Sequence, residues 1–85
     1  MSELSWDDFR YVKAIAERRS LAGAAEELGV NHSTVFRRLA QIEERLGSRL
    51  FERNRTGYAL TPCGEEMVKL AERMNEDIIA FEREK

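Results

Sequence analysis

Residues 21–46 contain two short amphipathic helices with very few residues between them. In the first helix the apolar residues recur at the three-to-four spacing of one buried helical face, and they are Leu21, Ala24, Ala25 and Leu28. Gly29 tolerates the left-handed backbone of a helix end, and Asn31 is expected to cap the next helix. That second helix ends at Gly47, and its apolar residues are Val35, Leu39, Ile42 and Leu46. Helices joined this closely predict a helix-turn-helix, whose second helix is shaped to enter a DNA major groove.

The outward face of the second helix carries side chains suited to nucleic acid. At about 100° per residue, the apolar stripe leaves a polar group of residues on the other side, namely Ser33, Thr34, Arg37 and Gln41, with Arg38 at its flank. Hydroxyl, amide and guanidinium groups of this kind form hydrogen bonds with base edges and bind phosphates. A merely solvated helix face is the alternative, but it does not account for the tight turn before this helix.

The positive charge of the chain is concentrated around this helix. The 85 residues carry a formal net charge of −2. Residues 31–58 contain six arginines against three glutamates, whereas the segments before and after them are acidic. A local basic face is what contact with phosphate requires, and the low overall charge predicts weak non-specific binding.

Composition excludes several other classes of protein. A chain of 85 residues with 42% hydrophobic and 35% charged residues indicates one small helical domain, too short for a deep catalytic cleft. The single cysteine, Cys63, has no partner for an internal disulfide, and one histidine cannot form a metal-binding cluster. No apolar run has the length of a membrane span, and residues 1–9 do not resemble a signal peptide. We therefore expect a cytoplasmic protein that is not an enzyme and needs no cofactor or metal.

A further helix and a hairpin frame the central pair of helices. Ser5 followed by Asp8 predicts a capping box, and Ser20 is expected to cap the helix after it. The buried stripe of the first helix is expected to comprise Trp6, Phe9, Val12, Ile15 and Ala16. After Gly47, residues 50–53 and 58–61 favour strands and flank a turn at 54–57, which predicts a two-stranded wing.

Two arginines near the tip of this wing, Arg53 and Arg55, suit the DNA backbone or the minor groove. A hairpin whose arginines are merely solvated is the alternative.

A long last helix is predicted from residue 62 to residue 83. Thr61 is expected to cap it, and Pro62 is tolerated in a first helical turn. Its apolar residues recur at spacings of three and four, and they are Met67, Leu70, Met74, Ile78 and Phe81. So small a domain cannot bury this whole seam, so we expect a homodimer that reads an inverted repeat. Burial of the first half of the seam within the chain is compatible with this expectation.

The order and spacing of these elements resemble the N-terminal DNA-binding domain of LysR-type transcriptional regulators, over essentially the whole chain. The matching segments are SWDDFRYVKAIAERRSLAGAAEELGVNHSTVFRRLAQIEERLG, RLFERN, RTG and LTPCGEEM. The resemblance implies a mainly α fold, a winged helix-turn-helix with a three-helix core and a two-stranded β wing over residues 1–61. A linker and dimerisation helix would follow over residues 62–85. It also implies sequence-specific binding of double-stranded DNA, with any small-molecule effector acting through a domain absent from this chain.

The resemblance carries expectations for single residues. By motif position, the DNA-contacting residues of the family correspond here to His32, Ser33, Thr34, Phe36, Arg37 and Arg38, and to Arg53 in the wing. Three of them depart from the family pattern, because His32 replaces a usual glutamine, Ser33 a common proline and Phe36 a small residue. Phe36 lies at the border of the apolar stripe, where it could tuck into the edge of the core or lie against a thymine methyl group.

Two alternatives stay open at the level of the sequence. A winged helix from another regulator, such as the molybdate-responsive type, would have a similar DNA-binding half. A winged helix used only for protein contacts is the second alternative, although arginines at positions 37, 38, 53 and 55 argue against it. DNA binding that weakens with added salt would separate a DNA-binding domain from such a module.

Overall fold

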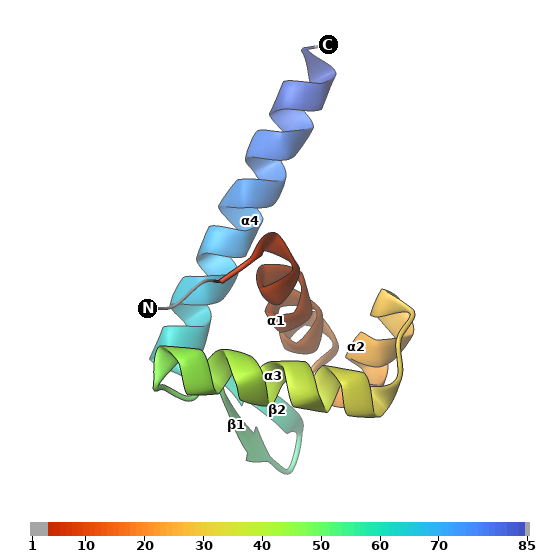
Figure 1. Ribbon diagram of the computed structural model, residues 1–85, viewed down its shortest axis with the longest axis vertical. Coiled ribbons are helices and arrows are strands. Elements are labelled where there is room, and N and C mark those ends of the chain that lie inside the picture. The colour runs from red at the N-terminus through yellow and green to blue at the C-terminus, as the bar shows by residue number, and fades with distance from the viewer. Residues whose placement is uncertain (1–3, 85) are drawn as a thin grey trace.

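Three helices pack around a common core, a hairpin lies at their side, and a fourth helix leads away from them (Figure 1). The computed structural model describes residues 4–84. In that part of the chain the elements are α1 (Trp6–Arg18), α2 (Leu21–Leu28), α3 (His32–Leu46), β1 (Phe51–Asn54), β2 (Gly57–Leu60) and α4 (Pro62–Arg83). The predicted mainly helical fold class, with a wing and a long last helix, is confirmed. The outer limits of the two predicted segments, residues 1 and 85, lie outside the described residues.

Short-range hydrogen bonds start most of the helices where the sequence predicts. The Asp8 N–H donates to Ser5 Oγ at 3.4 Å and the Ser5 N–H donates to the Asp8 carboxylate at 3.0 Å, which completes the capping box of α1. Ser20 and Thr61 cap α2 and α4 in the predicted way. The prediction for Asn31 is wrong, because its side chain accepts no hydrogen bond from α3 and its backbone carbonyl closes the first turn instead.

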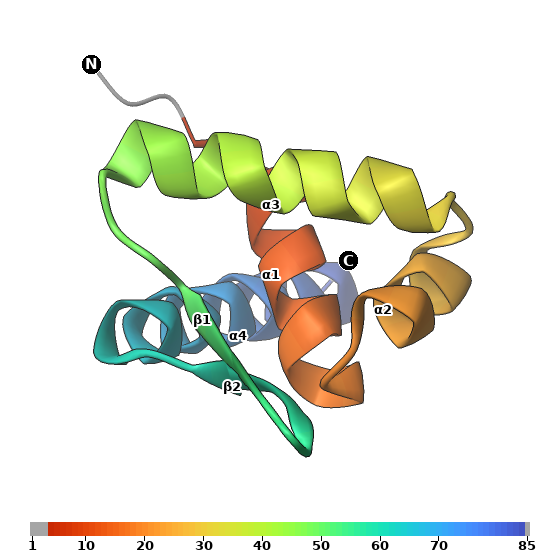
Figure 2. The same cartoon turned by 90° about the horizontal axis from the view of Figure 1, so that it is seen from below.

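The core lies between α1 and the elements that surround it, which are α2, α3 and the beginning of α4 (Figure 2). Its fully buried side chains include Val12 and Ile15 from α1 and Val35 and Ile42 from α3. Trp6, predicted to be buried, is 36% exposed. The reason is helical geometry, since Trp6 lies nine residues before Ile15 and therefore about 180° around the helix. The buried face of α1 is instead completed by other residues, which are Asp8, Tyr11 and Ala14.

The wing is an antiparallel hairpin of two four-residue strands. Each strand is shifted by about one residue from the predicted stretches, with Phe51 opposite Leu60 and Asn54 opposite Gly57. Gly57 has φ +121°, and a Cβ atom there would collide with the carbonyl oxygen of Arg19 in the turn between α1 and α2. The next residue, Tyr58, donates its N–H to that same carbonyl at 3.1 Å. The wing is therefore anchored to the end of α1.

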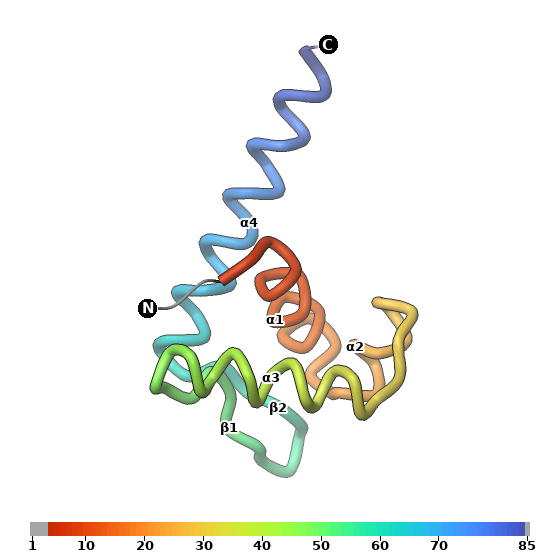
Figure 3. Tube along the Cα trace, viewed as in Figure 1, coloured from red at the N-terminus to blue at the C-terminus, as the bar shows by residue number. Residues whose placement is uncertain are grey.

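α4 packs on the domain only through its first half. Gly64, Met67 and Ala71 are buried, and α4 contacts α1 and β2. From residue 76 to residue 84 every side chain is exposed. The trace in Figure 3 shows this second half of α4 leaving the body of the molecule.

Candidate nucleic-acid interface

The apolar stripe of α3 sets the rotation of that helix about its own axis. Val35, Leu39 and Ile42 are buried, and α3 contacts both α1 and α2. As a consequence, the predicted contact residues that are exposed are His32, Ser33, Phe36, Arg37 and Gln41. Thr34 and Arg38 lie half-buried at the border. The structure thus brings the predicted residues of α3 to one surface, but with unequal access to a ligand.

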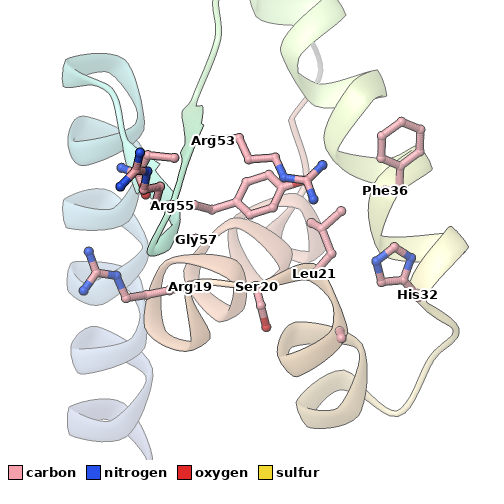
Figure 4. Close-up of a pocket in the computed structure, with 11 residues that line it drawn as sticks. Arg19, Ser20, Leu21, His32, Phe36, Arg53, Arg55 and Gly57 are labelled. Atoms are coloured by element: carbon pink, nitrogen blue, oxygen red, sulfur yellow. The ribbon is translucent and has the colours of Figure 1, made fainter.

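The two borders of this surface have different surroundings. One border is a shallow depression lined by polar side chains, which are Thr34, Arg37, Arg38 and Gln41. At the other border, His32 and Phe36 share a hollow with Arg19 and Arg53 (Figure 4). Phe36 is 58% exposed, so it does not tuck into the edge of the core. A surface of this composition offers hydrogen-bond donors and cations to a polyanion.

Arg38 is tied to the interior of its own domain. Its guanidinium donates to Asp8 at 3.1 Å and stacks 4.6 Å from the centre of the Tyr11 ring. Asp8 also accepts from Arg45 at 3.2 Å, and its side chain is only 2% exposed. A buried carboxylate with these partners connects α1 to two positions of α3 that lie about two helical turns apart. No hydrogen bond or ion pair of Arg37 is found among the described contacts. Its side chain is therefore available to a ligand, whereas that of Arg38 is bound to Asp8.

The role of Asp8 was not predicted from the sequence. Its local position explains the capping box, but the two arginines lie 30 and 37 residues further along the chain. The sequence does contain one indication of this pairing. Arg38 and Arg45 are seven positions apart, which places two cations on the same face of α3.

The side chains of the two predicted wing arginines, Arg53 and Arg55, point in different directions. The guanidinium of Arg53 stacks 5.9 Å from the centre of the Tyr58 ring and extends toward α3, whereas Arg55 points away from α3 (Figure 4). Arg19, which is not among the site residues predicted from the sequence, lines the same hollow as Arg53 and Arg55. It comes from the turn that anchors the wing, so only the folded chain brings it to this place.

The residues of the predicted dimer seam fall into two groups. Met67 is 4% exposed and belongs to the core of its own chain, so it is not available to a second copy. Leu70, Ile78 and Phe81 are 47%, 43% and 62% exposed, and Met74 is half-buried. Burial of the first part of the seam thus holds for Met67, whereas the seam residues Leu70, Ile78 and Phe81 lie at the surface.

The elements that form this surface match the model of one protein family. The family model described as bacterial regulatory helix-turn-helix protein, LysR family, matches residues 6–65. The chain belongs to the LysR family. The match covers α1, α2, α3, the wing and the first turn of α4, which are the elements that form the surface described above.

Two relatives show how this LysR-family domain compares with longer proteins. The HTH-type transcriptional regulator CzcR of Bacillus subtilis is 33% identical over 76 residues, which cover 89% of this chain and 26% of CzcR. The small neutral protease regulatory protein of Streptomyces coelicolor is 39% identical over 82 residues, which cover 96% of this chain and 25% of that protein. The chain therefore spans about a quarter of the length of these relatives.

Solved structures of two similar domains contain DNA. The CbnR DBD–DNA complex has a TM-score of 0.82 with 28% identity, covering 95% of this chain and 93% of that one. The complex of the BenM DBD with catB site 1 DNA has a TM-score of 0.83 with 26% identity, covering 92% and 88%.

Family membership settles the class of the domain. The chain is the DNA-binding domain of a LysR-type transcriptional regulator, and this is a family of regulators and not of enzymes. Within residues 4–84, no helix combines the length and the apolar character needed to cross a membrane.

Proposed function

We propose that this domain recognises an operator in double-stranded DNA by placing the N-terminal half of α3 in the major groove. The observation that carries this proposal is the exposed polar face of α3, turned away from the stripe formed by the buried Val35, Leu39 and Ile42 and the half-buried Leu46. Ser33, Arg37 and Gln41 occupy that face, and their side chains offer hydroxyl, guanidinium and amide groups to base edges. The likeness to two solved DNA complexes supports it.

The remaining residues at the borders of α3 have supporting roles in this proposal. His32 lies in the first turn and Thr34 beside it, where donors reach either a base edge or the adjoining phosphates. Arg38, whose guanidinium is already bound to Asp8, retains 30% exposure of its side chain and contacts a phosphate at the flank of the groove.

The wing contributes contacts that do not depend on sequence. Arg53 and Arg55 bind the phosphate backbone or enter the neighbouring minor groove, and Arg19 adds a third cation beside them. Since Arg53 and Arg55 point to different sides of the wing, they contact different phosphates. These contacts set the position of α3 on the duplex.

Two copies of the domain, joined through α4, would read an inverted repeat. The exposed apolar residues Leu70, Ile78 and Phe81 support this part of the proposal, together with the half-buried Met74. A two-fold symmetric dimer requires the same symmetry in its operator. In a complete regulator, a small-molecule effector would act through a further domain. Because bacterial chromosomal DNA lies in the cytoplasm, the protein would act there.

A selection from a pool of random duplexes tests the proposal. We expect the 85-residue chain to enrich one motif with inverted symmetry, and binding to fall with rising salt in proportion to the number of phosphate contacts. Genomic fragments give a second pool and would reveal the natural operator. If duplexes bind but no motif is enriched, the proposed sequence-specific recognition is wrong. If no duplex binds even at low salt, the proposed contacts of α3 and of the wing with DNA are wrong as well.

A further inference from the structure

Phe36 presents an aromatic ring to solvent within a polar surface. Phe36 is 58% exposed, compared with 36% for Trp6 of α1. The neighbouring positions of α3 explain the exposure, because Val35 and Leu39 occupy the side of the helix that faces the core. Phe36 is therefore dispensable for the core, and its ring is available to a ligand.

Phe36 lines two neighbouring hollows that lie between α3 and the wing. The first hollow is also lined by His32 and Arg53, and the second by Ala40 and Arg53. Figure 4 shows the ring on α3 beside His32, with the guanidinium of Arg53 extending toward it from the wing. An exposed apolar ring beside the guanidinium of Arg53 fits a ligand that combines negative charge with small apolar groups, and duplex DNA has both.

We propose that Phe36 is a specificity-determining residue that reads the 5-methyl group of a thymine in the operator. This inference rests on the proposed function, because it requires α3 to lie in the major groove. The phenyl ring has no hydrogen-bond donor or acceptor, and the thymine methyl is the apolar group that a base pair presents in that groove. Against a G·C pair the ring would instead displace water from polar groups and offer them no replacement.

The position of Phe36 within α3 agrees with this assignment. It lies in the first half of the helix, the part that reaches base edges when a recognition helix enters the groove. Arg37 follows it and lies about 100° around the helix. One turn of α3 would therefore carry a side chain that forms hydrogen bonds with a base and another that makes an apolar contact. The proposed half-site therefore has a thymine close to the base pair that Arg37 contacts.

Deoxyuridine substitution tests the inference directly, because it removes the 5-methyl group of thymine and leaves base pairing unchanged. The selected operator would be prepared with each thymine replaced in turn, and the affinity of the chain and of Phe36→Ala measured for each duplex. We expect one position in each half-site at which the parent loses affinity about fourfold, the ratio expected for one buried methyl group. Phe36→Ala should show no loss at that position.

Arg37→Ala is the matched control, since it removes the neighbouring reader and keeps the ring. It should bind more weakly overall and still lose affinity when the same thymine is replaced. If the parent binds its operator but loses no affinity when any thymine is replaced, the proposed recognition of thymine by Phe36 is wrong, although DNA binding itself stands. An equal loss in the parent and in Phe36→Ala would overturn this recognition too. If the parent binds no duplex at all, the proposed function fails and the inference fails with it. Circular dichroism of each variant confirms that the fold is retained.

Discussion

At the residue scale, two adjacent arginines of α3 differ in what they can do. Arg37 lies on the exposed face, while the side chain of Arg38 is bound to a carboxylate that is 2% exposed. Neighbouring residues of a helix point about 100° apart, so one of them can face a ligand while the other faces α1. Base recognition therefore depends mainly on Arg37, and Arg38 together with Arg45 holds α3 against Asp8.

Replacing Arg37 by alanine should weaken operator binding by about 1–3 kcal/mol and relax the preference at one base pair, because a bidentate contact to guanine is lost. Fluorescence anisotropy with the operator and its single-base-pair variants measures both effects. Arg73→Ala is the control, since it removes an exposed arginine from α4, an element that belongs neither to the recognition helix nor to the wing. Equal affinities of Arg37→Ala and the parent would contradict the assignment of α3 as the recognition helix.

Replacing Asp8 by asparagine should lower the free energy of unfolding by about 2 kcal/mol, because two arginines lose their buried counter-charge. The value lies below that of a wholly buried pair, since the arginine side chains are 30% and 44% exposed. Urea unfolding followed by circular dichroism gives the measurement. The control is Asp7→Asn, whose partner Arg10 is at the surface with 46% exposure, and which should change stability by less than about 0.5 kcal/mol. Similar losses in both variants would mean that burial of Asp8 adds nothing.

At the element scale, the wing is held by hydrogen bonds to other elements at two places, before β1 and at the start of β2. Glu43 of α3 accepts the Leu50 N–H at 2.8 Å where the chain enters β1, and Tyr58 donates to Arg19 at 3.1 Å beyond the hairpin turn. The turn itself is closed by Asn54, whose side chain accepts from the Thr56 N–H at 3.0 Å. A hairpin held in this way can present its arginines at a set distance from α3.

Replacing Arg53 and Arg55 together by alanine should weaken binding to all duplexes alike. The slope of log affinity against log salt should shrink by about one for each phosphate contact removed. Titrations at several salt concentrations measure the slope. The double variant of Lys69 and Arg73 makes the same change in net charge on exposed positions of α4, and should leave the slope close to that of the parent. An unchanged slope in the wing variant would mean that Arg53 and Arg55 contact no phosphate and that the hairpin has only a structural role.

At the scale of the whole molecule, α4 carries apolar side chains beyond the reach of the domain. Ile78 is 43% exposed in the second half of α4, which leaves the body of the molecule, and Leu70 is 47% exposed in the first half. Surface of this kind, repeated at spacings of three and four, is typical of a helix that packs against another helix. The α4 helix of a second copy, packed parallel or antiparallel, would cover this apolar surface.

Replacing Met74 and Ile78 by serine should shift the chain from dimer to monomer and cost more affinity for an inverted repeat than for a half-site, because only the dimer places two recognition helices at once. Sedimentation at high micromolar concentrations measures the association. Ile79→Ser is a matched control, since Ile79 is 42% exposed but lies about 140° around the helix from Met74. A parent that stays monomeric over this range, and binds half-site and inverted repeat equally, would contradict the dimer.

The sequence by itself determined the features that depend on neighbours within about one helical turn. The caps at Ser5, Ser20 and Thr61 and the glycine ends of α2 and α3 are local hydrogen bonds and local backbone conformations, so residue type at a fixed spacing predicts them. The buried stripe of α3 follows from helical periodicity in the same way, and with it the exposed polar face of the candidate site.

Only the tertiary structure decided where separate elements meet. The pairing of Asp8 with Arg38 and Arg45 depends on the crossing of α1 and α3, and the contact of Gly57 with Arg19 depends on how the hairpin folds back. For the same reason Met67 proved to be a core residue, because the packing of α4 on α1 determines which part of a continuous apolar seam is covered. Periodicity shows that a face is apolar, but the element that covers it is chosen by packing between segments far apart in the chain.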